Sequence, residues 1–165
     1  MFRTLLPVLL CLGLPCFAEG FKLPGIGTEK PAAPICQNIP GDQNNCVRVL
    51  ACIGSDGLYF DGAARGWDQG IVTGATSEGI PCAGHWRSGG FLGSGTSQMR
   101  CEDGLGVDVL YYTQDGVTGT VIGRGTDSLG RAIIVWTGEN VLKYLTPEGR
   151  PNAELPCGPT PIPVS

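Results

Sequence analysis

The chain of 165 residues is poor in the residues on which many enzymes and nucleic-acid-binding proteins depend. It has one histidine, His85, which excludes a metal site built from several histidines. Charged residues make up only 16% of the chain, and 15 acidic against 11 basic residues give a net charge of −4. Phosphate binding needs a basic stripe, which the sequence lacks, so we expect no nucleic-acid partner.

Long apolar runs are also missing, apart from the stretch between Leu5 and Leu14. This stretch is too short to span a bilayer, which takes about 20 residues. It follows Arg3 and precedes small residues ending at Ala18, which is the layout of an export signal. We therefore predict a signal peptide over residues 1–18, cleaved after about Ala18. The mature protein would be periplasmic or secreted, with no membrane span.

Cleavage would leave six cysteines, none of them in a Cys-x-x-Cys pair, which excludes a zinc ribbon and a thioredoxin-type redox motif. An even number of cysteines in an exported chain indicates disulfides. The disulfide candidates are Cys36, Cys46, Cys52, Cys82, Cys101 and Cys157. The sequence leaves the connectivity open, although a bridge from Cys101 to Cys157 would clasp the whole second half.

Two proline- and glycine-rich ends enclose a more regular body. Residues 19–45 have no uninterrupted apolar pattern and predict an extended arm. Residues 147–165 hold six prolines between Pro147 and Pro163, which predicts a tail held by Cys157. In the body, residues 46–146, no glycine-free stretch has apolar residues at helical spacing over three turns.

The body instead alternates apolar and polar residues, as strands with one buried face do. One such run, 107–112, leads to Asp115-Gly116, a pair that favours a tight hairpin turn. Further strands are expected over 117–123 and 131–137, with a short strand over 140–145. We predict an all-β protein, a small antiparallel sandwich or barrel built from β-meanders.

An internal repeat is indicated when the sequence is displaced by 49 residues. Cys52 then aligns with Cys101, and a displacement one residue longer aligns Trp86 with Trp136. Three further pairs match: Gly70 with Gly119, Val72 with Val121, and Gly74 with Gly123. The alternative is chance recurrence among the 27 glycines. The cysteine and tryptophan pairs favour two related units, about 46–95 and 96–146, that share one core. We expect strand glycines to lie on the outer face, where they permit twist or close approach.

Catalytic chemistry has weak support. His85 has Ser77 and Ser88 nearby in sequence, but no Gly-x-Ser-x-Gly elbow is present. Acidic residues such as Asp56 and Asp61 are close to glycines, which is the ordinary composition of turns. We predict no catalytic, cofactor or metal site. A hydrolase that uses the acidic residues near His85 is the third and least favoured hypothesis.

Partner binding is the alternative to chemistry. The adjacent Tyr111 and Tyr112 must point to opposite sides of a strand, so at least one is expected at the surface. The segment 124–131 is expected to include a turn between strands. The candidate partner-binding residues are Arg124, Asp127, Ser128, Tyr111 and Tyr112.

The frame CEDG, VLYY, WTGENVLKYL and the closing Cys157, within residues 101–157, resembles the small periplasmic β-barrels that inhibit lysozyme. Their Ser-Gly-Ala-x-Tyr type of loop is absent, and residues 127–131 are the nearest equivalent. Our leading hypothesis is an exported non-enzymatic β protein of the bacterial envelope with a binding or structural role. The alternative is a periplasmic inhibitor of a lysozyme or protease that acts through residues 124–131. The partner, an envelope protein or a hydrolase, is not identified by the sequence.

Overall fold

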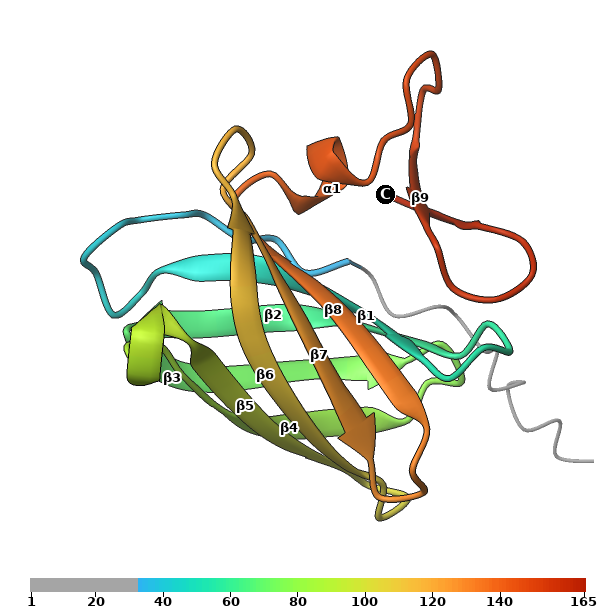
Figure 1. Cartoon of the computed structure of the whole chain (residues 1–165), viewed down its shortest axis with the longest axis horizontal. Helices are drawn as coiled ribbons and strands as arrows, with labels where there is room; N and C mark the ends of the chain where they lie inside the picture. The colour runs from blue at the N-terminus through green and yellow to red at the C-terminus, as the bar shows by residue number, and fades with distance from the viewer. Residues whose placement is uncertain (1–32) are drawn as a thin grey trace, which may run out of the picture.

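The computed structural model describes residues 33–165. Eight antiparallel strands follow one another in chain order, and the last pairs with the first to close a barrel (Figure 1). The all-β prediction is therefore confirmed, and the barrel is the architecture found. The predicted signal peptide, residues 1–18, and the first part of the arm, residues 19–32, lie outside the described residues.

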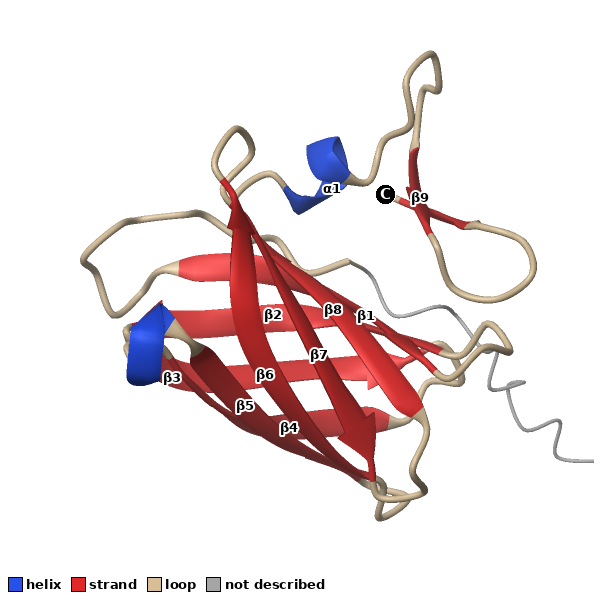
Figure 2. Cartoon of the chain, viewed as in Figure 1, coloured by secondary structure: helices blue, strands red, loops and turns tan. Residues whose placement is uncertain are grey.

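The elements succeed one another with short turns (Figure 2). The barrel strands are β1 Cys46–Ile53, β2 Tyr59–Trp67, β3 Gln69–Thr76, β4 Pro81–Arg87, β5 Gly95–Cys101, β6 Gly106–Asp115, β7 Thr120–Asp127 and β8 Ala132–Gly138. A 3₁₀ turn, η1 Phe91–Gly93, joins β4 to β5, and α1 Val141–Tyr144, β9 Ala153–Leu155 and β10 Ile162–Val164 complete the chain. Between residues 33 and 165 no helix has the length and apolar character needed to cross a membrane.

The interior core is formed by alternate residues of the barrel strands, because every second side chain of a strand points to the same face. Its buried members are Val49, Ala51, Ile53, Phe60, Ala64, Val72, Cys82, Cys101, Leu105, Val107, Val109, Ile133 and Val135. These side chains come from seven strands and the β5–β6 turn, so the barrel closes around one apolar centre.

A second core lies outside the barrel wall, where the C-terminal segment packs over β8 and β1. Leu50 and Trp136 point outward and are buried there with Leu155 and Val164. Arg48 on β1 also binds the C-terminal segment, because its Nη1 donates to the backbone oxygen of Ser165 at 2.6 Å. Both faces of β8 are thus covered, which explains the consecutive apolar residues 133–135 in a strand.

The three disulfides pair all six predicted cysteines: Cys36–Cys46, Cys52–Cys157 and Cys82–Cys101. The suggested bridge from Cys101 to Cys157 is wrong. Cys101 faces the interior, directly opposite Cys82 in the β4–β5 register, whereas Cys157 belongs to the outer core. The barrel wall separates the two sulfur atoms. Cys157 joins the C-terminal segment to Cys52 on β1.

The two pairs that favoured the repeat are not structurally equivalent. Cys52 lies in the outer core and Cys101 in the interior, while Trp136 is buried in the outer core and Trp86 packs against the interior core. Strands β1–β4 and β5–β8 do follow one another at a displacement close to 49. Only the two β3–β7 matches, Val72 with Val121 and Gly74 with Gly123, keep the matched positions on the same face. The repeat therefore stays a prediction.

Strand glycines such as Gly74 and Gly123 lie inside the barrel, which corrects the expectation that strand glycines lie on the outer face. Gly74 pairs with Cys82, and Gly123 pairs with Tyr111, both of which face inward. A Cβ on Gly74 would lie 2.6 Å from Cζ of Phe60, and one on Gly123 would lie 2.7 Å from Cδ1 of Tyr111. Glycine therefore provides the space that the aromatic rings fill.

Two local predictions are also corrected. Residues 140–145 form α1 rather than a strand, because Val141 and Leu145, four residues apart, both pack into the outer core. The turn after β6 is not an Asp-Gly pair. It runs from residue 116 to Gly119, which adopts a φ of 68°, and the Asp115 carboxylate accepts from the amide of Thr118 at 2.7 Å.

Candidate functional site: the open mouth of the barrel

The two ends of the barrel are packed differently. Toward the β1–β2 and β7–β8 turns, the interior encloses a void of only about 20 Å³, lined by residues such as Ile53, Phe60 and Ile133. At the opposite end a cavity of about 510 Å³ opens between the strand ends. This volume falls in the range of small-molecule sites, roughly 300–1,000 Å³. We call this end the mouth.

The wall of the mouth cavity is mainly apolar and aromatic. The wall receives residues from all eight strands, so closure of the barrel, not any single loop, creates it. The apolar and aromatic lining residues are Val47, Val49, Ala64, Trp67, Val72, Trp86, Tyr111, Tyr112 and Val121. Short side chains and the glycines Gly95 and Gly119 at this end leave the space open.

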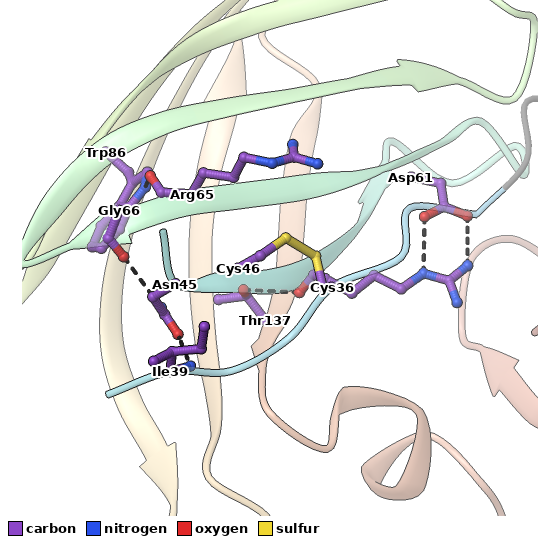
Figure 3. Close-up of a disulfide and its surroundings, with 10 residues drawn as sticks. Cys36, Ile39, Asn45, Cys46, Asp61, Arg65, Gly66, Trp86 and Thr137 are labelled. Atoms are coloured by element: carbon purple, nitrogen blue, oxygen red, sulfur yellow. Dashed lines mark hydrogen bonds and ion pairs between the residues drawn. A yellow bond between two sulfur atoms is a disulfide. The ribbon is translucent and has the colours of Figure 1, made fainter. Parts of the chain in front are cut away.

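Several polar groups around the cavity are committed to the protein itself (Figure 3). The indole nitrogen of Trp86 donates to the carbonyl of Arg65 at 3.1 Å. Asn45 donates to the carbonyl of Gly66 at 3.1 Å and accepts from the amide of Ile39 at 2.7 Å. With these groups already bonded, most of the wall offers apolar contacts, while Arg87, Gln114 and Glu139 add polar and charged side chains to it.

The arm between residues 33 and 45 is fixed beside the mouth. The Cys36–Cys46 disulfide ties it to the start of β1, and Figure 3 shows Asn45 linking Ile39 to the end of β2. Asn38 and Pro40 from this arm contribute to the cavity wall. The predicted arm therefore has a structural part in the site over its described residues.

One polar pair lies where the cavity meets the packed interior. The hydroxyls of Ser97 and Tyr111 are 3.1 Å apart, and Ser97 is buried. Burial raises the pKa of Tyr111 above its ordinary value, and the hydrogen bond with Ser97 opposes this only in part. The phenol is therefore neutral at neutral pH and offers a hydrogen bond, not a charge.

The five candidate partner-binding residues do not form one site. Tyr111 packs inside, whereas Tyr112 is 50% exposed and its hydroxyl accepts from Nε of Arg124 at 2.6 Å. The expectation that the two tyrosines face opposite sides is confirmed. Asp127 and Ser128 lie at the packed end, in the β7–β8 turn.

Asp127 organises that turn. Its carboxylate is buried, lies 2.6 Å from Nε of Arg131 and accepts from the amides of Leu129 and Arg131 at 2.9 and 2.8 Å. Burial alone would raise the pKa of Asp127, but the hydrogen bonds and the Arg131 charge prevail and lower it. Ser128 accepts from the amide of Gly106 at 3.1 Å. These contacts give the turn a fixed shape, with Leu129 exposed at its tip.

The residues considered for catalysis are dispersed. His85 lies on the outer face of β4, in register with Ile71 and Gln98. Asp61 is bound through both carboxylate oxygens to Arg48, at 3.0 and 2.6 Å. Within residues 33–165 no group of three or more histidine, cysteine, aspartate or glutamate side chains could hold a metal ion.

Sequence reasoning missed the mouth cavity. Many of its lining residues were recognisable individually as strand residues, but nothing in the sequence grouped them into one site. No sequence signal states which end of a barrel stays open, because that depends on the volumes of residues brought together from all eight strands.

Comparison with known proteins gives no family. No family model matches the chain, and no curated protein matches it. Among solved structures, the chain is similar to a de novo designed fluorescence-activating β-barrel, with 17% sequence identity and a TM-score of 0.46. The match covers 63% of this chain and 95% of the designed one. A similarity at this level carries no information about function.

Proposed function

We propose that this protein is an exported, non-enzymatic carrier that holds one small apolar molecule in the mouth cavity. The observation that carries the proposal is the contrast between the cavity of about 510 Å³ at the mouth and the void of about 20 Å³ in the rest of the interior. Eight-stranded barrels are just wide enough to be filled by side chains or to hold one small ligand. In this barrel, side chains fill one end and the other end has room for a ligand.

The chemistry of the wall defines the ligand class. Trp67, Trp86 and Tyr111 offer ring surfaces, while valines from three strands supply the rest. With the Trp86 indole and the Asn45 amide already bonded, the ligand is mainly apolar. The Ser97–Tyr111 pair provides the polar contact that a single hydroxyl or carbonyl group on the ligand would use.

Three disulfides support the exported part of the proposal, since disulfides form and persist in oxidising compartments. The pattern of residues 1–18 is consistent with the same location. We place the protein in the bacterial periplasm or the secreted fraction, after removal of these residues.

A dye titration tests the carrier. N-phenyl-1-naphthylamine, a neutral apolar dye, is expected to bind, with a rise in its fluorescence and quenching of tryptophan emission. Val121→Trp would plug the cavity and weaken dye binding at least about tenfold, which corresponds to roughly 1.4 kcal/mol. Ile71→Trp is the matched control, because Ile71 is half-exposed on the outer face of β3. Equal dye affinity in the wild type and Val121→Trp would refute the cavity as the binding site.

The second candidate is inhibition of a hydrolase through the predicted segment 124–131. A specific observation favours it: the turn is fixed by Asp127 and presents Leu129, which is 73% exposed. Capture of a lysozyme or protease from envelope extract that Leu129→Ala abolishes would support this function. A hydrolase captured equally well by Leu129→Ala would count against an inhibitory role for the turn.

A further inference from the structure

The mouth is surrounded by apolar side chains that the folded protein leaves in water. Phe91 and Leu92 in the β4–β5 turn are 87% and 90% exposed, and Val117 in the β6–β7 turn is 85% exposed. We call these three residues the mouth rim. Both turns also contribute to the cavity wall, through Gly93 and Gly119, so the rim continues the apolar surface of the cavity outward.

These side chains do little for the stability of the barrel. An apolar side chain stabilises a fold when it is removed from water, and the mouth rim remains in water. Leu92 also adopts a φ of 57°, a left-handed conformation in which glycine would be less strained. Strained residues that give no packing in return are often found at functional sites. The rim is therefore better explained by a contact made outside the chain.

The chemistry around the mouth rim identifies the kind of contact. The turn sequences SGGFLGS, 88–94, and GVTG, 116–119, have no charged residue. The nearby Asp115 carboxylate accepts hydrogen bonds from the amides of Val117 and Thr118 within its own turn. The rim residues therefore carry no charge, and the charged side chains in the adjoining cavity wall, Arg87 and Glu139, are one of each sign. The hydroxyls of Ser88 and Ser94 are already bonded to backbone carbonyls.

We propose that the mouth rim inserts into the interface of a lipid bilayer, so that an apolar ligand passes between membrane and cavity without crossing water. The inference rests on the proposed carrier function. Isolated apolar tips on separate turns need no complementary pocket in a fluid acyl layer, and buried apolar area drives this kind of binding. Because the rim has no charge, the binding depends little on anionic lipid or on salt.

Co-sedimentation with vesicles of phosphatidylcholine tests the proposal, with and without added phosphatidylglycerol and at low and high salt. The wild type is expected to bind in all four conditions. The double variant Phe91→Ser, Leu92→Gly should partition about 100-fold more weakly, which corresponds to roughly 2.8 kcal/mol. Glycine at position 92 relieves the backbone strain, so the variant is expected to fold. Leu129→Ser, at an exposed apolar tip on the packed end, is the matched control and should bind as the wild type does.

Titration with N-phenyl-1-naphthylamine in solution separates this proposal from the carrier function. The double variant should bind the dye like the wild type, which also shows that its barrel is folded. If the wild type binds vesicles but not the dye, the proposal of membrane docking stands and the proposed carrier function is refuted. Docking is overturned if the wild type fails to bind phosphatidylcholine, if the double variant binds it equally well, or if Leu129→Ser loses binding to the same extent. It is also overturned if binding requires phosphatidylglycerol, or if sedimentation shows that the rim joins two copies instead.

Discussion

Removal of the Cys52–Cys157 disulfide should cost more stability than removal of Cys82–Cys101. The first bridge closes a loop with a sequence separation of 105 and the second a loop with a separation of 19. In the chain-entropy model these separations correspond to roughly 4.8 and 3.2 kcal/mol. All four cysteines are buried, so substitution by alanine removes similar packing in both variants. The difference of roughly 1.5 kcal/mol therefore isolates the effect of loop length.

Urea unfolding of the two double-alanine variants, followed by tryptophan fluorescence and circular dichroism, measures this difference. Trp136 lies under the C-terminal segment and Trp86 in the barrel wall, so the fluorescence also reports whether the two regions unfold together. A single transition is required for the comparison. The reasoning is refuted if the Cys82→Ala, Cys101→Ala variant loses as much free energy of unfolding as the Cys52→Ala, Cys157→Ala variant, or more.

Other predictions concern the β7–β8 turn and the interior glycines. The lowered pKa of Asp127 means that its stabilising effect is present above the unfolded pKa of about 3.9 and is lost as the pH falls through the folded value. Asp127→Asn should therefore lower the free energy of unfolding at pH 7 and make it depend less on pH in the acid range. An unchanged pH profile would contradict this role. Gly123→Ala should destabilise the barrel by about 1–3 kcal/mol, because the new Cβ meets Tyr111 at 2.7 Å. The control is Gly116→Ala, whose added Cβ would have no neighbour within 4 Å. Equal melting temperatures of the two variants in thermal denaturation would refute the packing argument.

Much of the fold could be predicted from local patterns. Alternation along residues 107–112 identified one strand, because one face of it is buried, and the consecutive apolar residues within 131–137 identified another, both faces of which are covered. The six cysteines and the export-type N-terminus predicted disulfides. The one misassigned element, residues 140–145, is too short for strand and helix periods to be distinguished. The contacts of Val141 and Leu145 with the outer core decide it.

The features that bear on function were less accessible. The matched tryptophans Trp86 and Trp136 suggested equivalence, but a shift of one residue in a strand moves a side chain to the other face. The candidate partner-binding residues were chosen from neighbouring segments, and the structure distributes them among the interior, the outer face and the packed end. The mouth cavity combines residues from all eight strands, whose spacing along the chain does not reveal that they meet.

By itself, therefore, the sequence determined what each short segment can do: which segments form strands, where turns are possible and which thiols are available for oxidation. Only the tertiary structure decided which cysteines pair, which face each aromatic ring occupies and which end of the barrel stays open. Local periodicity depends on a few neighbouring residues, whereas disulfide partners and cavity volume depend on register and closure around all eight strands.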